Sequence, residues 1–329
     1  MKKNKDRLPL QQAALLRYIL RRLLIVLPVL VGITLIDYLI MSMAGNPLEM
    51  LIGPRISQEA IRARELQLGL DKPFLVQYVI WLKQIFSGNF GYSIKDFQPV
   101  AAKVLGHLGP TLLLMGSSLL LSLLIAVPAG IYSAIRQYTK ADYAIVSASF
   151  IGTSIPGFFL GLVFLYIFHV RLGYLPASGM RTLGGGGGFV DVLRHLLMPM
   201  LVLTISGVGS NIRYIRASML EILQQDYLRS ARAKGVGPRR LILRHALRNA
   251  LVPILTVIGM QVPLLFGGTV IIEQIYSWPG LGLLTMQAIF DRDYPVIMAV
   301  CLLSAIVVLV ANLITDILYA LVDPSIRYD

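Results

Sequence analysis

Charged residues are scarce in this sequence, and cysteine is nearly absent. Lys, Arg, Asp and Glu make up 14% of the 329 residues, whereas soluble domains carry about 25%. The composition is therefore not that of a soluble globular protein. Cys301 is the single cysteine, so an intrachain disulfide is excluded and the redox compartment is not indicated.

A nucleotide-binding P-loop is also missing. Such a loop needs glycines followed by a lysine and then Ser or Thr at the start of a helix. The glycine run 184–188 is followed instead by Phe189 and Val190, which is typical of a flexible loop. We therefore expect that the chain is not an enzyme, does not hydrolyse nucleotide by itself and needs no cofactor.

What the sequence does contain is long apolar stretches. Hydrophobic residues make up 56% of the chain, and a membrane-spanning helix needs about 20 mostly apolar residues. Prolines within or near the stretches are tolerated when neighbouring helices satisfy the freed carbonyl groups, so we expect a packed bundle. The sequence predicts an all-α polytopic membrane protein with six spans, at about residues 23–43, 111–135, 143–170, 196–215, 251–275 and 295–322.

Basic residues predict the orientation of these spans. Cytoplasmic loops are enriched in Lys and Arg. The N-terminus, the loop 136–140 and the segment after the fourth stretch are basic, and six spans place all three on one side. We expect both termini to be cytoplasmic. The first stretch exceeds the roughly 7–15 apolar residues of a signal peptide, so we expect it to stay uncleaved.

The segment 44–109 is long for a simple connection and carries its own helical patterns. Residues 57–69 have the composition and end signals of a helix. Residues 74–86 are amphipathic, with Tyr78 and Trp81 suited to a membrane interface. Two interpretations stay open here: a helical cap lying on the outer leaflet, or part of a docking surface for an extracytoplasmic partner.

One basic segment interrupts the apolar pattern between the fourth and fifth stretches. Residues 219–234 favour a helix, and Gly235 can end it in the left-handed conformation. Pro238 suits the first turn of a second helix, which then runs into the fifth span. The sequence therefore predicts a helix–turn–helix, the basic hairpin, standing on the cytoplasmic face.

The basic hairpin has three interpretations. It could fix topology and bind anionic lipid headgroups, at about 1 kcal/mol per Arg. It could be a DNA-binding helix-turn-helix, but both flanks are bound into the membrane and a recognition helix could hardly reach a major groove, so no nucleic acid is expected. It could be a rigid lever gripped by a cytoplasmic partner, in which case the turn matters and not the charge alone.

The hairpin resembles the cytoplasmic loop of binding-protein-dependent ABC import permeases, in the branch that handles peptides and nickel. That loop reads Glu-Ala-Ala, three residues and Gly. Ala231 and Gly235 match it, and the departures at Arg229 and Ser230 are shared by the peptide branch. Further stretches similar to that branch are LGLDKPFLVQYVIWL, GNFGYS, LGYLPASG and EQIYSWPGLGLL. Nearly the whole chain is similar to the first, B-type, of two paired permease subunits.

The resemblance implies a type I ABC importer permease fold in the bacterial cytoplasmic membrane and a division of labour. Two homologous permeases form one translocation path, two cytoplasmic ATPase subunits sit below, and an extracytoplasmic substrate-binding protein delivers the substrate, expected to be a di- or oligopeptide. It also implies an N-terminal part, residues 1–109, and a five-helix core, residues 110–329, with its coupling loop at about 216–250.

A short coupling helix in that loop is implied to sit in a groove of the ATPase. On this sequence it corresponds to about residues 228–238. The residues implied to couple the permease to the ATPase are Asp226, Leu228, Arg229, Ser230, Ala231, Lys234, Gly235 and Pro238.

Ionisable residues near the spans suggest an alternative class, a proton-coupled secondary transporter. Asp37, His169, Glu273 and Asp316 lie in or near the ends of spans, where such groups are functional suspects. No inverted repeat or mid-span ion motif supports that class. Interfacial solvation or pairing across helices accounts for most of these residues.

A metal site and a membrane scaffold are the remaining alternatives. His107 and His195 lack the partner spacing of a metal site, so no metal is expected. A membrane scaffold without transport is the third class. The sequence leaves dipeptide, oligopeptide, nickel chelate and glutathione-like cargo open.

Overall fold

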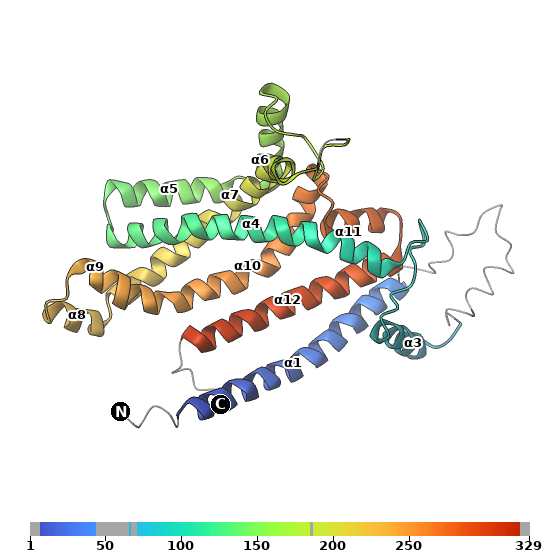
Figure 1. The fold of residues 1–329 in the computed structure, drawn as a ribbon, viewed down its shortest axis with the longest axis horizontal. Helices are drawn as coiled ribbons and strands as arrows, with labels where there is room; N and C mark the ends of the chain where they lie inside the picture. The colour runs from blue at the N-terminus through green and yellow to red at the C-terminus, as the bar shows by residue number, and fades with distance from the viewer. Residues whose placement is uncertain (1–6, 44–65, 67–70, 185–186, 323–329) are drawn as a thin grey trace.

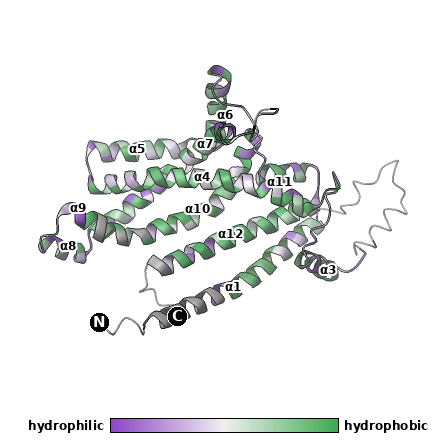
Figure 2. Ribbon diagram, viewed as in Figure 1, coloured by the Kyte–Doolittle hydropathy of each residue, from purple (hydrophilic) through white to green (hydrophobic). Residues whose placement is uncertain are grey.

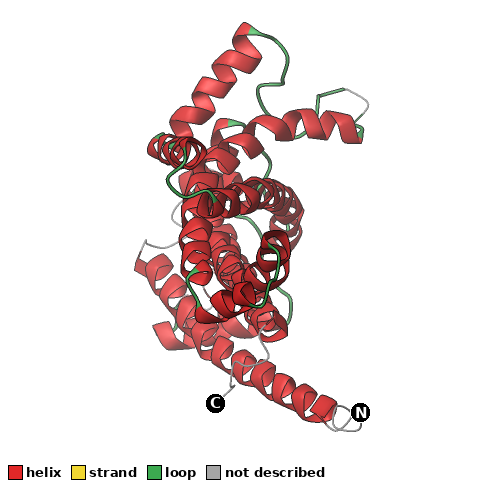
Figure 3. Ribbon diagram, turned by 90° about the vertical axis from the view of Figure 1, so that its left-hand side faces the viewer, coloured by secondary structure: helices red, strands yellow, loops and turns green. Residues whose placement is uncertain are grey.

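The computed structural model describes residues 7–43, 66, 71–184 and 187–322, and this part of the chain is built from helices and loops without a strand (Figures 1 and 3). The helix predicted over residues 57–69 lies outside the described residues, except for residue 66. The all-α prediction is confirmed.

Five long helices form the body of the molecule. They are α1 (Arg7–Met43), α4 (Val100–Ile135), α7 (Phe189–Leu223), α10 (Leu247–Ile275) and α12 (Tyr294–Val322). Four of them contain a segment long and apolar enough to cross a membrane. In α10 the apolar segment Val252–Pro263 is shorter. Figure 2 shows hydrophobic colouring along the long helices and hydrophilic colouring at the tip near α8.

The third predicted span is not one straight helix. It consists of α5 (Lys140–Ser154), α6 (Gly157–Phe164) and a π-helical turn, η2 (Leu165–Arg171), and the chain bends by 91° between α5 and α6. Pro156 explains the break, because its ring excludes the preceding residue from helical geometry. Ile155 is extended accordingly, with φ −86° and ψ 121°.

Prolines inside the remaining long helices do not end them. Pro28, Pro128, Pro199 and Pro263 all lie within continuous helices, as expected for a packed bundle. At Gly259, an added Cβ would lie 2.7 Å from the Thr315 Cγ2 atom. Glycine is therefore what lets α10 approach α12 closely.

The packing order places α7 at the centre. It contacts α4, α5 and α10, while α12 contacts α10 on one side and α1 on the other. The short helix α8 (Asp226–Ala233) lies at one end of the bundle, which we call the hairpin end; the beginning of α1 lies at the same end (Figure 1). The helices α3 (Phe74–Phe86) and α11 (Leu281–Phe290) lie at the opposite end.

Candidate functional site

The basic hairpin begins with a break that the sequence did not reveal. Residues 219–234 were predicted as one helix, but α7 ends at Leu223 and α8 begins at Asp226. Between them Gln225 has an extended backbone, with φ −67° and ψ 142°. The predicted bounds of the coupling helix, 228–238, are wrong as well, because α8 ends at Ala233.

Leu228 fixes α8 to the bundle. Its side chain is 2% exposed and belongs to one buried cluster with Ile215 and Met219 of α7 and with Ala134 of α4. The break before α8 turns the chain so that Leu228 points back into this cluster. Fully burying a leucine side chain contributes roughly 1.5–3 kcal/mol, so Leu228, the one buried residue of α8, anchors a very polar helix.

The turn after α8 is a Schellman motif centred on Gly235. Gly235 has φ +80°, as its sequence position predicted. Its N–H donates to the Arg232 carbonyl at 3.0 Å, and the Val236 N–H donates to the Ala231 carbonyl at 3.2 Å, which is the bond pair that defines the motif. Val236 and Ala231 both pack against the Leu228 cluster, so the turn has a fixed direction.

The second half of the hairpin continues into the bundle as expected. Pro238 is the first residue of α9 (Pro238–Arg240). A π-helical turn, η3 (Leu241–Ala246), then leads without interruption into α10. Asn249 of α10 donates to the Tyr227 hydroxyl of α8 at 2.6 Å. This bond across the hairpin was not predicted, because the two residues are 22 positions apart and no local pattern links them.

Most of the predicted site residues face away from the bundle. Ala231 is half-buried. The exposed ones are Asp226, Arg229, Ser230, Lys234, Gly235 and Pro238. Asp226 and Arg229 pair at 3.5 Å with both side chains largely exposed, a kind of contact that stabilises little. Helix α8 and its turn therefore present charge to solvent, while Leu228 anchors them in the bundle.

A buried ion pair braces the helix that carries the hairpin. Asp142 of α5 is 2% exposed and accepts from Nε and Nη2 of Arg216 on α7, both at 2.8 Å. The Ser133 hydroxyl and the Tyr138 N–H donate to the same carboxylate. Sequence reasoning missed Asp142, although Thr139 three residues earlier is a recognisable N-cap.

A second buried carboxylate lies at the opposite end. Glu273 of α10 is fully buried and accepts from the Thr111 hydroxyl at 2.8 Å and from the Leu283 N–H at 3.0 Å. Thr111 in turn accepts from the Leu281 N–H at 2.7 Å. This network attaches the start of α11 to α4 and α10, and it accounts for Glu273 without a proton-relay role.

The loop that contains GNFGYS is clamped at the same end. Asp293 is 2% exposed and accepts from the Ser93 hydroxyl and the Ile94 N–H. Nearby, Asp96 accepts from the Lys103 ammonium 2.8 Å away, which lowers the pKa of Asp96 to about 2. The loop before α4 is thereby bound to the turn between α11 and α12.

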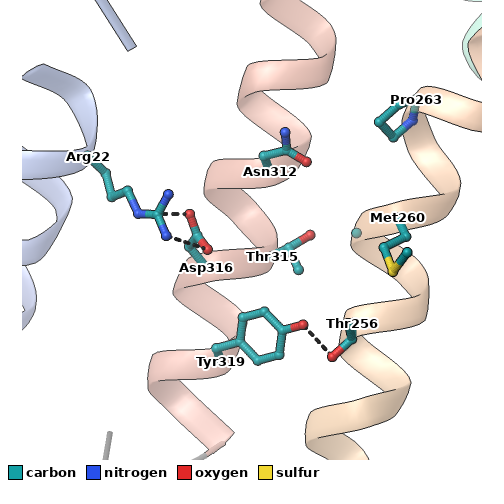
Figure 4. Close-up of a pocket in the computed structure, with 9 residues that line it drawn as sticks. Arg22, Thr256, Met260, Pro263, Asn312, Thr315, Asp316 and Tyr319 are labelled. Carbon is teal, nitrogen blue, oxygen red and sulfur yellow. Dashed lines mark hydrogen bonds and ion pairs between the residues drawn. The ribbon is translucent and has the colours of Figure 1, made fainter. Parts of the chain in front are cut away.

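The other ionisable residues have mostly local partners. Asp316 pairs with Arg22 of α1 at 3.1 Å, beside a pocket between α1, α10 and α12 (Figure 4). His169 Nδ1 lies 2.9 Å from the Leu175 carbonyl. Among the described residues, the buried Oδ2 atom of Asp37 has no hydrogen-bond partner. Pairing across helices is thus confirmed for Asp316.

The histidines considered as metal ligands lie apart. His107 Nδ1 is 2.7 Å from the Lys103 carbonyl, and His195 Nδ1 is 2.9 Å from the Asp191 carbonyl. Each contact lies within one helix. In the part of the chain that the structure describes, no three His, Cys, Asp or Glu residues gather as a metal would require.

Comparison with known proteins decides the family. The model of the binding-protein-dependent transport system inner membrane component matches residues 126–328. The chain belongs to this family. The N-terminal model of such membrane components matches residues 15–115. The protein is therefore a permease subunit of a binding-protein-dependent ABC transport system and a multi-pass membrane protein.

Several curated relatives cover almost the whole permease. It is 45% identical to the oligopeptide transport system permease protein AppB of Bacillus subtilis, over 94% of this chain and 99% of that one. It is 37% identical to the di/tripeptide transport system permease protein DppB of Pseudomonas aeruginosa, over 95% and 99%. It is 35% identical to the glutathione transport system permease protein GsiC of Escherichia coli, over 95% and 100%.

A solved structure shares the fold. The permease superposes on a chain of the MetNI methionine ABC transporter in an inward-facing conformation, with a TM-score of 0.56 and 17% identity. The match covers 68% of the permease and 98% of the other chain. At this identity the likeness concerns the fold alone.

Proposed function

We propose that the permease forms half of the translocation path of an ATP-driven importer for di- or oligopeptides. A second homologous permease, two cytoplasmic ATPase subunits and an extracytoplasmic substrate-binding protein would complete the complex. The names of the relatives support peptides as the substrate class, since oligopeptide and di/tripeptide systems are among them. The family membership supports the division of labour.

The same proposal includes six spans in a type I importer fold. They are α1, α4, the bent unit from α5 to η2, α7, α10 and α12. α10 has 29 residues and is about 43 Å long at 1.5 Å per residue, which exceeds the roughly 30 Å hydrocarbon core. An even number of spans would place both termini on the hairpin side, which the basic residues predict to be cytoplasmic. Residues 1–109 would form the N-terminal part and 110–329 the five-helix core with the coupling loop at 216–250.

Within this importer, α8 and its turn would act as the lever that an ATPase subunit grips. The observation that carries this is the Schellman turn at Gly235, joined to the buried anchor Leu228. A lever must transmit force in a fixed direction. The coupling surface would comprise Asp226, Leu228, Arg229, Ser230, Ala231, Lys234, Gly235 and Pro238, with Leu228 acting from beneath.

Two glycines in the turn offer a matched test. Gly235 has φ +80°, whereas Gly237 has φ −63° and ψ 151°, and an added Cβ meets nothing within 4 Å at either. A side chain at positive φ costs roughly 1–2 kcal/mol, but Val fits the backbone of Gly237 without strain. We expect Gly235→Val to abolish peptide uptake and Gly237→Val to keep it, with both proteins inserted in the membrane.

The measurement is uptake of a labelled tripeptide, beside co-purification of the ATPase subunits. Loss of uptake in Gly235→Val should appear with continuing ATP hydrolysis or with loss of the ATPase from the complex. Equal uptake in both glycine variants would contradict the lever. If uptake then fell stepwise as Arg229, Arg232 and Arg240 were neutralised, the hairpin would be a lipid anchor.

Reconstitution separates this proposal from a proton-coupled secondary transporter. The permease alone in proteoliposomes should not accumulate peptide when a proton gradient is imposed. The complete complex should accumulate peptide when ATP is supplied on the side of the membrane that carries the ATPase subunits. Gradient-driven uptake by the permease alone would decide for the secondary transporter.

A further inference from the structure

The amphipathic helix α3 packs against the side of α1, and its contacts show how far along the apolar span of α1 it lies. The Tyr78 hydroxyl lies 2.9 Å from the Thr34 hydroxyl, and the Tyr38 hydroxyl donates to Gln77 at 3.2 Å. Thr34 and Tyr38 belong to the apolar span Leu24–Met43. Figure 1 shows α3 lying across this end of α1.

The depth of α3 follows from these contacts. Tyr38 precedes the end of the apolar span at Met43 by five residues, or about 7–8 Å at 1.5 Å per residue. The Tyr38 ring also contacts the rings of Phe74, Tyr78 and Trp81 at centroid distances of 5.5–5.8 Å. The helix is therefore level with the last turns of the span and does not stand beyond it.

A second face of α3 is apolar and uncovered. Leu75 is 67% exposed, Val79 46% and Phe86 82%. Spacings of four and seven residues place them on one stripe, roughly a quarter turn from the buried Tyr78. Gln84 lies on the opposite side from the stripe and is exposed. Lys83 is the one charged residue among the thirteen of α3.

We propose that α3 is an interfacial helix whose Leu75, Val79 and Phe86 stripe is inserted in the lipid at the end of the bundle opposite the hairpin. Such helices bury their apolar face about 5–10 Å into the boundary between headgroups and acyl chains, which is the depth that the Tyr38 contacts give. At the same level of α1, Ile40 and Met43 are 53% and 79% exposed, so exposed apolar surface of the span reaches the height of the stripe.

Charge and polarity agree with lipid as the occupant. Lys83 borders the stripe, where a long side chain can reach the headgroups. Tyr78 and Trp81, on the side of α3 that contacts Tyr38 of α1, are of the kinds enriched at membrane interfaces. A water-soluble partner would instead meet the polar side that carries Gln84.

Site-directed spin labelling of the full-length permease tests the proposal. In a Cys301→Ser background, Val79→Cys and Phe86→Cys place the label on the stripe, and Gln84→Cys is the matched control on the same helix. The protein is reconstituted in phosphatidylcholine–phosphatidylglycerol vesicles. Collision with oxygen reports lipid exposure, and collision with a water-soluble nickel chelate reports exposure to water.

We expect an oxygen-to-nickel collision ratio several-fold higher at positions 79 and 86 than at 84, with a depth of 5–10 Å below the phosphates. High nickel access at position 79 would overturn the proposal. Low access to both reagents would also overturn it, because it would indicate a protein contact. The measurement is repeated in the complete complex and with added substrate-binding protein, so that a contact with either partner is detected. The Phe86→Asp variant should lower the oxygen access of a label at position 79, whereas Gln84→Asp should leave it unchanged.

Discussion

The two ends of the bundle each bury a carboxylate, and they hold it in different ways. At the hairpin end Asp142 faces a guanidinium, with both Arg216 contacts at 2.8 Å. At the opposite end Glu273 is held by the Thr111 hydroxyl and the Leu283 N–H, and none of the ion pairs among the described residues includes it. One site depends on a charge pair, and the other on neutral donors.

The difference follows from what each site joins. Arg216 comes from α7, the helix that leads to the hairpin, so its pairing with Asp142 ties the base of the hairpin to the first turn of α5. Glu273 caps the start of α11, where the unpaired backbone N–H groups and the helix dipole favour a negative group. Changing charge should therefore matter most at the hairpin end, and changing shape should matter most at the other.

Asp142→Ala should give the largest loss of stability. It leaves the Arg216 guanidinium without its carboxylate, and removing one partner of a buried pair costs roughly 3–5 kcal/mol. Because the Arg216 side chain keeps 22% exposure, we expect about 3 kcal/mol, near the lower end of that range. The measurement is the fraction of detergent-purified permease that stays monodisperse after heating to graded temperatures.

Asp226→Ala is the control for this variant. Asp226 pairs with Arg229 at 3.5 Å, but its side chain is 95% exposed, and exposed pairs contribute less than about 1 kcal/mol. A shift as large for Asp226→Ala as for Asp142→Ala would show that burial of the pair is not what stabilises the hairpin end.

Gly282→Ala should lower stability at the opposite end through a steric clash, without any change of charge. An added Cβ would lie 2.6 Å from the Val270 Cα atom and 2.8 Å from Glu273 Oε2, and the backbone neighbour cannot move aside easily. Overpacking of this kind costs roughly 1–3 kcal/mol. In the same heating assay, Gly116→Ala is the control, because its Cβ would meet nothing within 4 Å and Ala favours the helix. Equal stability of both variants would contradict the tight approach of α11 to α10.

The sequence predicted local features of the hairpin better than contacts between helices. Gly235 and Pro238 act within their own turn, so their types were enough to place the left-handed residue and the start of α9. The pairs Asp142–Arg216 and Thr111–Glu273 join positions 74 and 162 residues apart. Nothing in the local pattern selects such partners, because they meet only when the helices pack.

The bend at Pro156 depends both on a local residue type and on contacts between helices. The proline was visible in the sequence, but several other prolines lie within helices that continue past them. Whether a proline bends a helix by a few degrees or breaks it depends on whether neighbouring groups satisfy the freed carbonyls. That is a property of the packed bundle, and so the third span was predicted as a single helix.

Glu273→Gln should give the smallest effect and compares the two ends most directly. The amide keeps the size of the carboxylate and one acceptor oxygen, so one of the bonds from Thr111 and Leu283 survives. Losing the other, in a site without a cationic partner, should cost about 1 kcal/mol. The matched change at the hairpin end, Asp142→Asn, removes the charge opposite Arg216 and should cost clearly more. Heating both purified variants beside the unmodified permease ranks them, and a Glu273→Gln loss equal to that of Asp142→Asn would mean that charge is as important to the Glu273 site as to the Asp142 site.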